Sequence, residues 1–231
     1  MSNRNWRTGW IVGVLLAVCA AAIAAPPACP IPLEVGAKWV YAGRAEWAES
    51  GKDGSTERLN WTAEVIRAER KGDAVVAVFR DFPTCSAWYS PGQAERFSVA
   101  LYRGGRFLLR EAESRKEAMR IANGAPGQWD AAITPMLEMP LRKGRRIGLD
   151  SPRSDTRYCW YVQSVGGAAP TVHGAPKGVG PLVRMVYVTN PDRQEMDLAA
   201  GLGIVRYKYH HNGTTAVTDL RLVSFTPGRL R

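Results

Sequence analysis

Histidine is scarce in this chain of 231 residues, which contains only His173, His210 and His211. The last two are adjacent near the end of an expected strand, where successive side chains point to opposite faces, so they do not favour one shared metal ion. A metal site would also need carboxylates or cysteines placed around it. The sequence therefore predicts no metal site and no other cofactor.

Motifs for covalent catalysis are also missing. The chain has no Gly-x-Ser-x-Gly segment, which would expose a nucleophilic serine at a sharp turn. Asp192, Glu195 and Asp197 are close in sequence, but spacing alone does not identify the paired carboxylates of a glycosidase. We therefore assign no catalytic residue and expect a protein that is not an enzyme.

Long apolar runs are limited to one stretch near the N-terminus, Trp10–Ala24. It follows the basic residues Arg4 and Arg7 and ends in small residues, the pattern of a cleaved secretory signal. The run is short for a membrane span, which needs about 20 residues. We predict a signal peptide over residues 1–25, a single domain over residues 26–231, and a periplasmic or secreted location.

A lipid anchor is the alternative for an exported chain with cysteines near its start. Cys19 follows Leu16-Ala17-Val18, and Cys29 follows Pro26-Pro27-Ala28. Neither segment fits the Leu-Ala-Gly/Ala-Cys pattern of lipoprotein signals, so we expect no anchor.

Cysteine is rare, and Cys29, Cys85 and Cys159 are too far apart in sequence for a Cys-x-x-Cys motif. In an oxidising compartment, one disulfide and one free thiol are expected. Three expected strands between Cys29 and Cys85 place them at opposite ends of a sheet, whereas a disulfide needs Cα atoms within about 7 Å. We predict a Cys85–Cys159 disulfide and leave Cys29–Cys159 open.

Acidic residues are outnumbered: 31 Lys and Arg against 21 Asp and Glu give a net charge of +10. Nucleic-acid binding would need these charges gathered on one surface. They are scattered instead, with one local cluster at Leu141–Arg146. We expect no nucleic-acid partner, and at most a weak attraction to anionic lipid or polysaccharide.

The residues that are present favour β-structure, most clearly in Pro32–Trp47. Trp39, Tyr41, Ala45 and Trp47 alternate with polar residues, which is the period of a half-buried strand. Gly104-Gly105 and His211-Asn212-Gly213 are typical of hairpin turns. The strands expected on these grounds cover 37–48, 58–69, 74–82, 96–102, 106–110, 156–164, 181–189, 203–210 and 215–225.

One convincing helix is expected, Glu111–Asn123, which is followed by a glycine stop signal. The first five strands form an antiparallel meander. The fold class predicted is therefore mainly β: a large curved antiparallel sheet, open or a half-barrel, with one short helix packed on a face.

Tryptophan is abundant, with six beyond residue 25 once Trp6 and Trp10 are set aside from the eight in the chain. Aromatic residues at strand positions pack cores, but they also line concave faces that hold apolar ligands. One helix is a thin cover for so many strands, which favours a partly open face. The candidate ligand-binding residues are Trp39, Tyr41, Trp61 and Val99.

Both ends of the chain resemble known sequences. Pro32-Leu33-x-x-Gly36-x-x-Trp39-x-Tyr41 and the closing Gly201-Leu202-Gly203-Ile204-Val205 with its hairpin resemble uncharacterised exported bacterial proteins and lipoproteins. The resemblance implies a β-rich envelope domain of unassigned function and carries no catalytic residue. The expected architecture is also similar to periplasmic lipoprotein carriers, whose curved sheet holds acyl chains under a helical lid.

These observations favour non-enzymatic binding of an apolar small molecule or lipid, or of an envelope protein. The alternatives are a structural or assembly protein that docks through a sheet edge, and a hydrolase of an envelope polymer. A cavity lined by Trp39, Trp61 and Val99 would favour a carrier, and a filled core with an exposed edge would favour docking. Two carboxylates about 5–10 Å apart in a cleft would favour a glycosidase. The sequence carries no signal for an oligomeric state.

Overall fold

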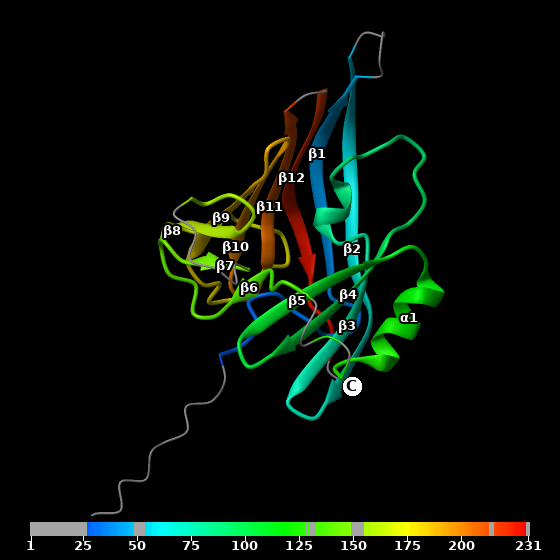
Figure 1. The fold of residues 1–231 in the computed structure, drawn as a ribbon, viewed down its shortest axis with the longest axis vertical. Helices are drawn as coiled ribbons and strands as arrows, with labels where there is room; N and C mark the ends of the chain where they lie inside the picture. The colour runs from blue at the N-terminus through cyan, green and yellow to red at the C-terminus, as the bar shows by residue number, and fades with distance from the viewer. Residues whose placement is uncertain are drawn as a thin grey trace, which may run out of the picture.

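The computed structural model describes residues 27–48, 54–127, 129, 133–148, 155–212 and 215–229, so the predicted signal peptide lies outside the described residues. All strands of the described chain join one antiparallel sheet in the order β6-β5-β4-β3-β2-β1-β12-β11-β10-β9-β8-β7 (Figure 1). The predicted class, mainly β with a curved antiparallel sheet and one short helix on a face, is confirmed. The elements are β1 (Lys38–Trp47), β2 (Ser55–Lys71), β3 (Ala74–Arg80), the 3-10 helix η1 (Pro83–Ser86), β4 (Phe97–Arg103), β5 (Arg106–Ala112), α1 (Arg115–Gly124), β6 (Leu137–Glu138), β7 (Arg146–Ile147), β8 (Trp160–Val165), β9 (Leu182–Val188), β10 (Asp192–Ala199), β11 (Gly203–Asn212) and β12 (Thr215–Thr226).

The sheet curls until its two edges approach each other, which gives a nearly closed barrel (Figure 1). The edge strands β6 and β7 are consecutive in the chain but stand at opposite ends of the strand order. Arg145, just before β7, donates from Nη2 to Glu138 Oε2 in β6 at 3.0 Å. Both edge strands fall where the sequence predicted no strand, because two-residue strands leave no alternating pattern to detect.

The central strand β1 pairs with β2 on one side and β12 on the other. Trp39, Tyr41 and Ala45 face the interior and are buried, as the alternation predicted, whereas Lys38 and Arg44 are exposed. Gly43 also faces inward. A Cβ there would overlap the Asp219 carbonyl oxygen and lie 2.9 Å from Leu220 Cδ2, so β1 and β12 can approach this closely only with a glycine.

The inner face is covered mainly by the sheet itself, which corrects the expectation of a thin cover. Ile31 and Leu33, from the segment before β1, are buried in the inner core at 2% and 7% exposure. The loop carrying η1 lies over the same face, where Thr218 Oγ1 donates to the carbonyl oxygen of Ser86 at 2.9 Å. The inner face is therefore enclosed by strands, by the N-terminal segment and by η1.

Helix α1 covers part of the outer face, over β3, β4 and β5 (Figure 1). Its apolar side, which includes Ile121, packs into a second core with strand residues such as Val78. Ser114 caps the helix by accepting from the Glu117 amide at 3.2 Å, while Glu117 accepts from the Glu113 amide at 2.9 Å. The helix begins later than predicted because residues 106–112 continue as β5.

The predicted disulfide between Cys85 and Cys159 is not formed, and both cysteines are free, as is Cys29. Cys85 lies in η1 with Sγ 3.4 Å from Ser98 Oγ of β4, whereas Cys159 Sγ lies 3.6 Å from the Thr156 carbonyl oxygen, just before β8. Strands β4 and β8 are in opposite halves of the strand order. Burial raises the pKa of the Cys85 thiol to about 12, so its thiolate is disfavoured.

Candidate functional site

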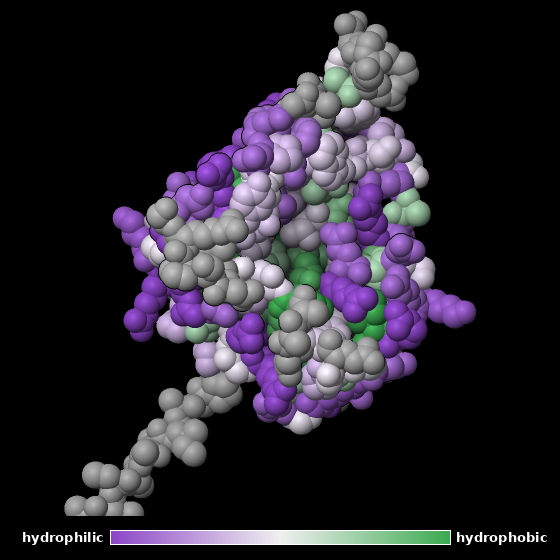
Figure 2. All heavy atoms as spheres, viewed as in Figure 1, coloured by the Kyte–Doolittle hydropathy of each residue, from purple (hydrophilic) through white to green (hydrophobic). Residues whose placement is uncertain are grey.

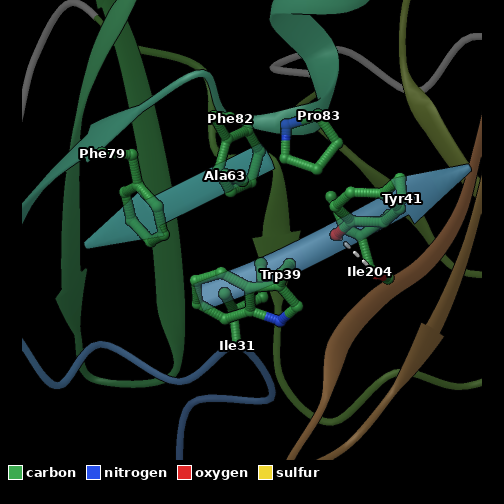
Figure 3. Close-up of a pocket in the computed structure, with 8 residues that line it drawn as sticks. All are labelled: Ile31, Trp39, Tyr41, Ala63, Phe79, Phe82, Pro83 and Ile204. Carbon is green, nitrogen blue, oxygen red and sulfur yellow. Dashed lines mark hydrogen bonds between the residues drawn. The ribbon is translucent and has the colours of Figure 1, made fainter. Parts of the chain in front are cut away.

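The predicted aromatic face exists, and its rings meet inside the barrel (Figure 3). They surround a cavity of about 10 Å³, about the smallest space that holds one water molecule. Protein side chains, not a ligand, therefore fill the interior at this point. The cavity is lined by Ile31, Trp39, Tyr41, Ala63, Phe79, Phe82, Pro83 and Ile204.

The polar atoms of this cluster already have partners in the backbone. Trp39 Nε1 donates to the Leu202 carbonyl at 2.6 Å, and the Tyr41 hydroxyl donates to the Ile204 carbonyl at 2.8 Å. Burial raises the pKa of Tyr41 well above its ordinary value, so the hydroxyl stays protonated as the donor. This arrangement is typical of a packed core, because the N–H of a buried Trp and the O–H of a buried Tyr usually have hydrogen-bond partners.

The predicted ligand-binding residues are divided between two layers. Trp39, Tyr41 and Trp61 share the inner core, and Trp61 Nε1 donates to the Asp81 carbonyl at 2.7 Å. Val99 instead belongs to the outer core beneath α1. No space joins the four residues, since the strand itself separates Val99 from the inner face.

A much larger hollow is a groove that we call the N-terminal groove. It runs between the segment Pro27–Val35 and the end of the β2–β3 hairpin and has a volume of about 680 Å³. Known small-molecule sites measure about 300–1,000 Å³. The groove is lined by Pro27, Ala28, Cys29, Ile31, Pro32, Leu33, Glu34, Val35, Ile66, Arg67, Ala68, Glu69, Arg70, Asp73, Val75, Tyr102, Gly104 and Arg229.

The floor of the N-terminal groove is apolar. Ala68 and Val75 line it and are half-buried against the inner core. Ile31 and Leu33 line it from the other wall. Tyr102 holds that wall in place by donating its hydroxyl hydrogen to the Pro27 carbonyl. The apolar surface of the core thus continues outward into the groove.

The rim of the N-terminal groove is charged. Arg67 is held by Glu69 at 2.9 Å and by Asn123 Oδ1 at 2.8 Å. Among the described residues, Arg70 and Arg229 have no side-chain hydrogen-bond partner and are exposed. Sequence analysis missed this site because Cys29-Pro30-Ile31-Pro32 indicates only an extended backbone and gives no sign of where that backbone packs.

A polar and aromatic cluster lies where the η1 loop meets β10 and β11. Asp192 Oδ1 accepts from the Tyr209 hydroxyl at 2.7 Å and from His211 Nδ1 at 2.8 Å. Trp88 is 49% exposed, and the centroid of its ring lies 4.4 Å from the centroid of the His211 ring. Burial opposes ionisation of Asp192, but the bonds from His211 and Tyr209 prevail and lower its pKa.

The chemistry available in this cluster is limited. Among the described residues, no serine or cysteine hydroxyl or thiol is hydrogen-bonded to His211, and no group of three metal-ligating residues is present anywhere. Glu195 and Asp197, the neighbours of Asp192 in sequence, pair with Arg193 and Arg184 on the outer face. The three carboxylates considered from the sequence are therefore not gathered in one cleft.

Within the described chain, no helix has the length and apolar character needed to cross a membrane.

Comparisons with known proteins add little. No protein-family model matches the sequence, and no curated protein is significantly similar to it. Two solved structures overlap most of the chain. One is a provisionally named exported protein with a YmcC-like fold from Bacteroides fragilis, with 13% identity, a TM-score of 0.40, and coverage of 85% of this chain and 98% of that chain.

The other is a provisionally named lipoprotein from Parabacteroides distasonis, with 11% identity, a TM-score of 0.37, and coverage of 87% of this chain and 100% of that chain. Both likenesses are too weak to indicate a function for this chain.

Proposed function

We propose that this chain is an exported, non-enzymatic binding protein that holds an apolar small molecule or a single acyl chain in the N-terminal groove. Export rests on the signal-like pattern of residues 1–25. The observation that carries the binding proposal is the position of Ala68 and Val75, which pack on the inner core and also form the floor of a groove of about 680 Å³. A ligand there would extend the core outward and bury apolar surface that the protein leaves open.

Because the interior beside Trp39 and Tyr41 is filled, the proposal places the ligand in the N-terminal groove. A cavity of about 10 Å³ has no room for an acyl chain, whereas the N-terminal groove does. The central recess in Figure 2, with hydrophobic residues at its bottom, lies over β11, β12 and β1 in the view of Figure 1, and the groove lies lower in the same view, beside the end of the β2–β3 hairpin. The ligand would therefore lie against the barrel wall and the N-terminal segment.

Docking through a sheet edge has less support. The edge strands β6 and β7 have two residues each, and Arg145 joins the two edges through Glu138. A partner strand needs a longer row of free backbone groups to add to a sheet. We therefore favour a small apolar ligand over a partner protein.

Fluorescence titration with the apolar probe N-phenyl-1-naphthylamine tests the proposal. Val75→Arg places a charged side chain on the groove floor, and its matched control is Val223→Arg, because Val223 is 46% exposed on the outside of the sheet. We expect saturable binding to the wild type and the control, and affinity at least about tenfold weaker in Val75→Arg, which corresponds to about 1.4 kcal/mol.

Circular dichroism checks that the variants fold. If Val75→Arg does not fold, Ala68→Trp fills the same floor with an apolar side chain and is expected to weaken the probe similarly. Equal probe affinity in the wild type and the folded groove variants, or no saturable binding to the wild type, would overturn the proposal.

A further inference from the structure

A second hollow lies on the outer face of the sheet, where β12, β1 and β2 run side by side. It has a volume of about 510 Å³, and we call it the arginine hollow. It is open because Ala42, which faces outward at its centre, has a small side chain, and the neighbouring Gly43 has none. Its lining residues are Ala42, Gly43, Arg44, Thr56, Arg58, Asp219 and Arg221.

Arginines face arginines around this hollow. Arg44 of β1 is directly opposite Arg58 of β2, and Arg206 of β11 is directly opposite Arg221 of β12. Like charges directly opposite each other in an antiparallel pair are destabilising. The Arg44–Arg58 pair therefore costs stability, and a bound anion would offset that cost, whereas Arg206 does not line the hollow and is compensated by Asp219.

The nearby carboxylates Glu46 and Asp219 neutralise only part of this charge. Asp219 is directly opposite Arg44 and accepts from Arg206 at 3.0 Å and 2.9 Å, so its single negative charge is shared between several arginines. Glu46 lies 3.2 Å from Arg44, whose side chain is still 62% exposed. Arg58 and Arg221 are exposed and have no hydrogen-bond partner in the described part of the chain.

The titration of Asp219 agrees with an excess of positive charge. Burial opposes its ionisation, but the Arg206 hydrogen bond and the charges of Arg206, Arg221 and Lys208 prevail and lower its pKa. Asp219 is thus a carboxylate under ordinary conditions and still leaves the hollow cationic. The charged groups around it are Arg44, Arg58, Arg206, Lys208 and Arg221 against Glu46 and Asp219.

We propose that the arginine hollow binds a phosphate group, held by Arg44, Arg58 and Arg221 from three adjacent strands. Neighbouring strands lie about 4.8 Å apart, so the three side chains start close enough to converge on one group. A phosphate offers several acceptor oxygens in a geometry that suits the planar fork of arginine. This site is on the outer face and does not depend on the N-terminal groove or on the function proposed for it.

The first test measures binding of inorganic phosphate at low ionic strength, from shifts of the arginine Nε–H signals in NMR spectra. The test variant is Arg58→Gln/Arg221→Gln. The control is Arg115→Gln/Lys116→Gln, which removes two charges from exposed residues of α1. We expect phosphate binding to weaken at least about tenfold in the test variant and to stay close to wild type in the control.

Two results would overturn the proposal: equal weakening in both double variants, which is the effect of net charge alone, or no phosphate binding by the wild type. A second arm compares sedimentation with phosphatidylglycerol-containing vesicles and with pure phosphatidylcholine vesicles. Phosphate binding together with vesicle binding, both lost in Arg58→Gln/Arg221→Gln, assigns the site to a lipid headgroup. Phosphate binding without vesicle binding assigns it to a soluble phosphate ester.

Stability supplies an independent readout. Because Arg58 faces Arg44, Arg58→Gln should raise the midpoint of thermal unfolding in the absence of ligand, and added salt should reduce the gain. An arginine with only a structural role would lower the midpoint when it is replaced. A lowered midpoint for a folded Arg58→Gln protein would therefore contradict the assignment.

Discussion

Trp39 Nε1 lies 2.6 Å from the carbonyl oxygen of Leu202, which is 163 residues later in the chain. The bond ties the central strand β1 to the turn before β11, across the interior of the barrel. Two residues further along β1, the Tyr41 hydroxyl donates a similar hydrogen bond to the Ile204 carbonyl oxygen at 2.8 Å. These bonds attach the aromatic cluster to the backbone, as in a packed core.

Trp39→Phe should destabilise the fold without affecting the N-terminal groove. The Leu202 carbonyl would stay buried without its donor, and an unsatisfied buried group costs about 1–3 kcal/mol. Urea unfolding measures the loss of free energy, and the probe titration measures groove binding. An unchanged unfolding free energy would contradict the role given to this bond.

Gly43→Ala should be destabilising by about 1–3 kcal/mol, the usual cost of forcing extra volume into a packed site. The added Cβ would overlap the Asp219 carbonyl and press on Leu220. Gly54→Ala is the matched control, because its Cβ would meet nothing closer than the Trp47 carbonyl oxygen at 3.8 Å. Equal unfolding midpoints for the two variants would be inconsistent with the close approach of β1 and β12.

Asp192→Asn should remove a pH-dependent part of the stability. The pKa of Asp192 is lowered below 3.8 in the folded protein, since the bonds from His211 and Tyr209 outweigh the effect of burial. The ionised carboxylate therefore stabilises the fold above its unfolded pKa, and this contribution is lost as pH falls through the lower folded pKa.

Urea unfolding over a pH series checks this prediction. We expect the free energy of unfolding of the wild type to exceed that of Asp192→Asn by about 1 kcal/mol near neutral pH. This is the size of a hydrogen bond to a charged group after allowance for partial exposure. The gap should shrink below pH 3.8. A gap that stays constant or widens towards acid pH would show that the stabilisation does not come from the ionised Asp192.

The cysteines should be reduced and slow to react in the folded protein. Burial is the main cause that raises the thiol pKa of Cys29 and of Cys85 to about 12, and it also raises that of Cys159. Alkylation by iodoacetamide should be slow in buffer and fast in denaturant, because only the thiolate reacts. A peptide that links Cys85 to Cys159 in the unreduced protein would contradict the free thiols of the structure.

Local patterns predicted most of the strands that have one buried face, but they missed β10, where charged residues hide the alternation. The alternation in β1 correctly placed Trp39 and Tyr41 inward, and Gly104-Gly105 correctly placed the turn between β4 and β5. The predicted hairpin at His211-Asn212-Gly213 is confirmed by the pairing of β11 with β12, although residues 213 and 214 lie outside the described chain. Period and turn chemistry are local, so a sequence carries them directly.

Curvature and the packing of irregular segments could not be predicted in this way. Whether a sheet stays open or curls depends on the twist and bulges of its strands, such as the irregularity between Val40 and Tyr41, which no alternation encodes. Val99 was grouped with the inner aromatics, although its strand turns that side chain towards α1. Ile31 and Val75 line the same N-terminal groove although they are 44 residues apart in the sequence, and no local pattern predicts that proximity.

We propose that the ligand is held in the N-terminal groove and not among the aromatic residues around Trp39 and Tyr41. Native mass spectrometry of wild type, Val75→Arg and Val223→Arg, each purified from the periplasm without detergent, tests it most directly. We expect a small apolar adduct on the wild type and on Val223→Arg, and none on folded Val75→Arg. An adduct retained by folded Val75→Arg, or bare protein in all three samples, would contradict it.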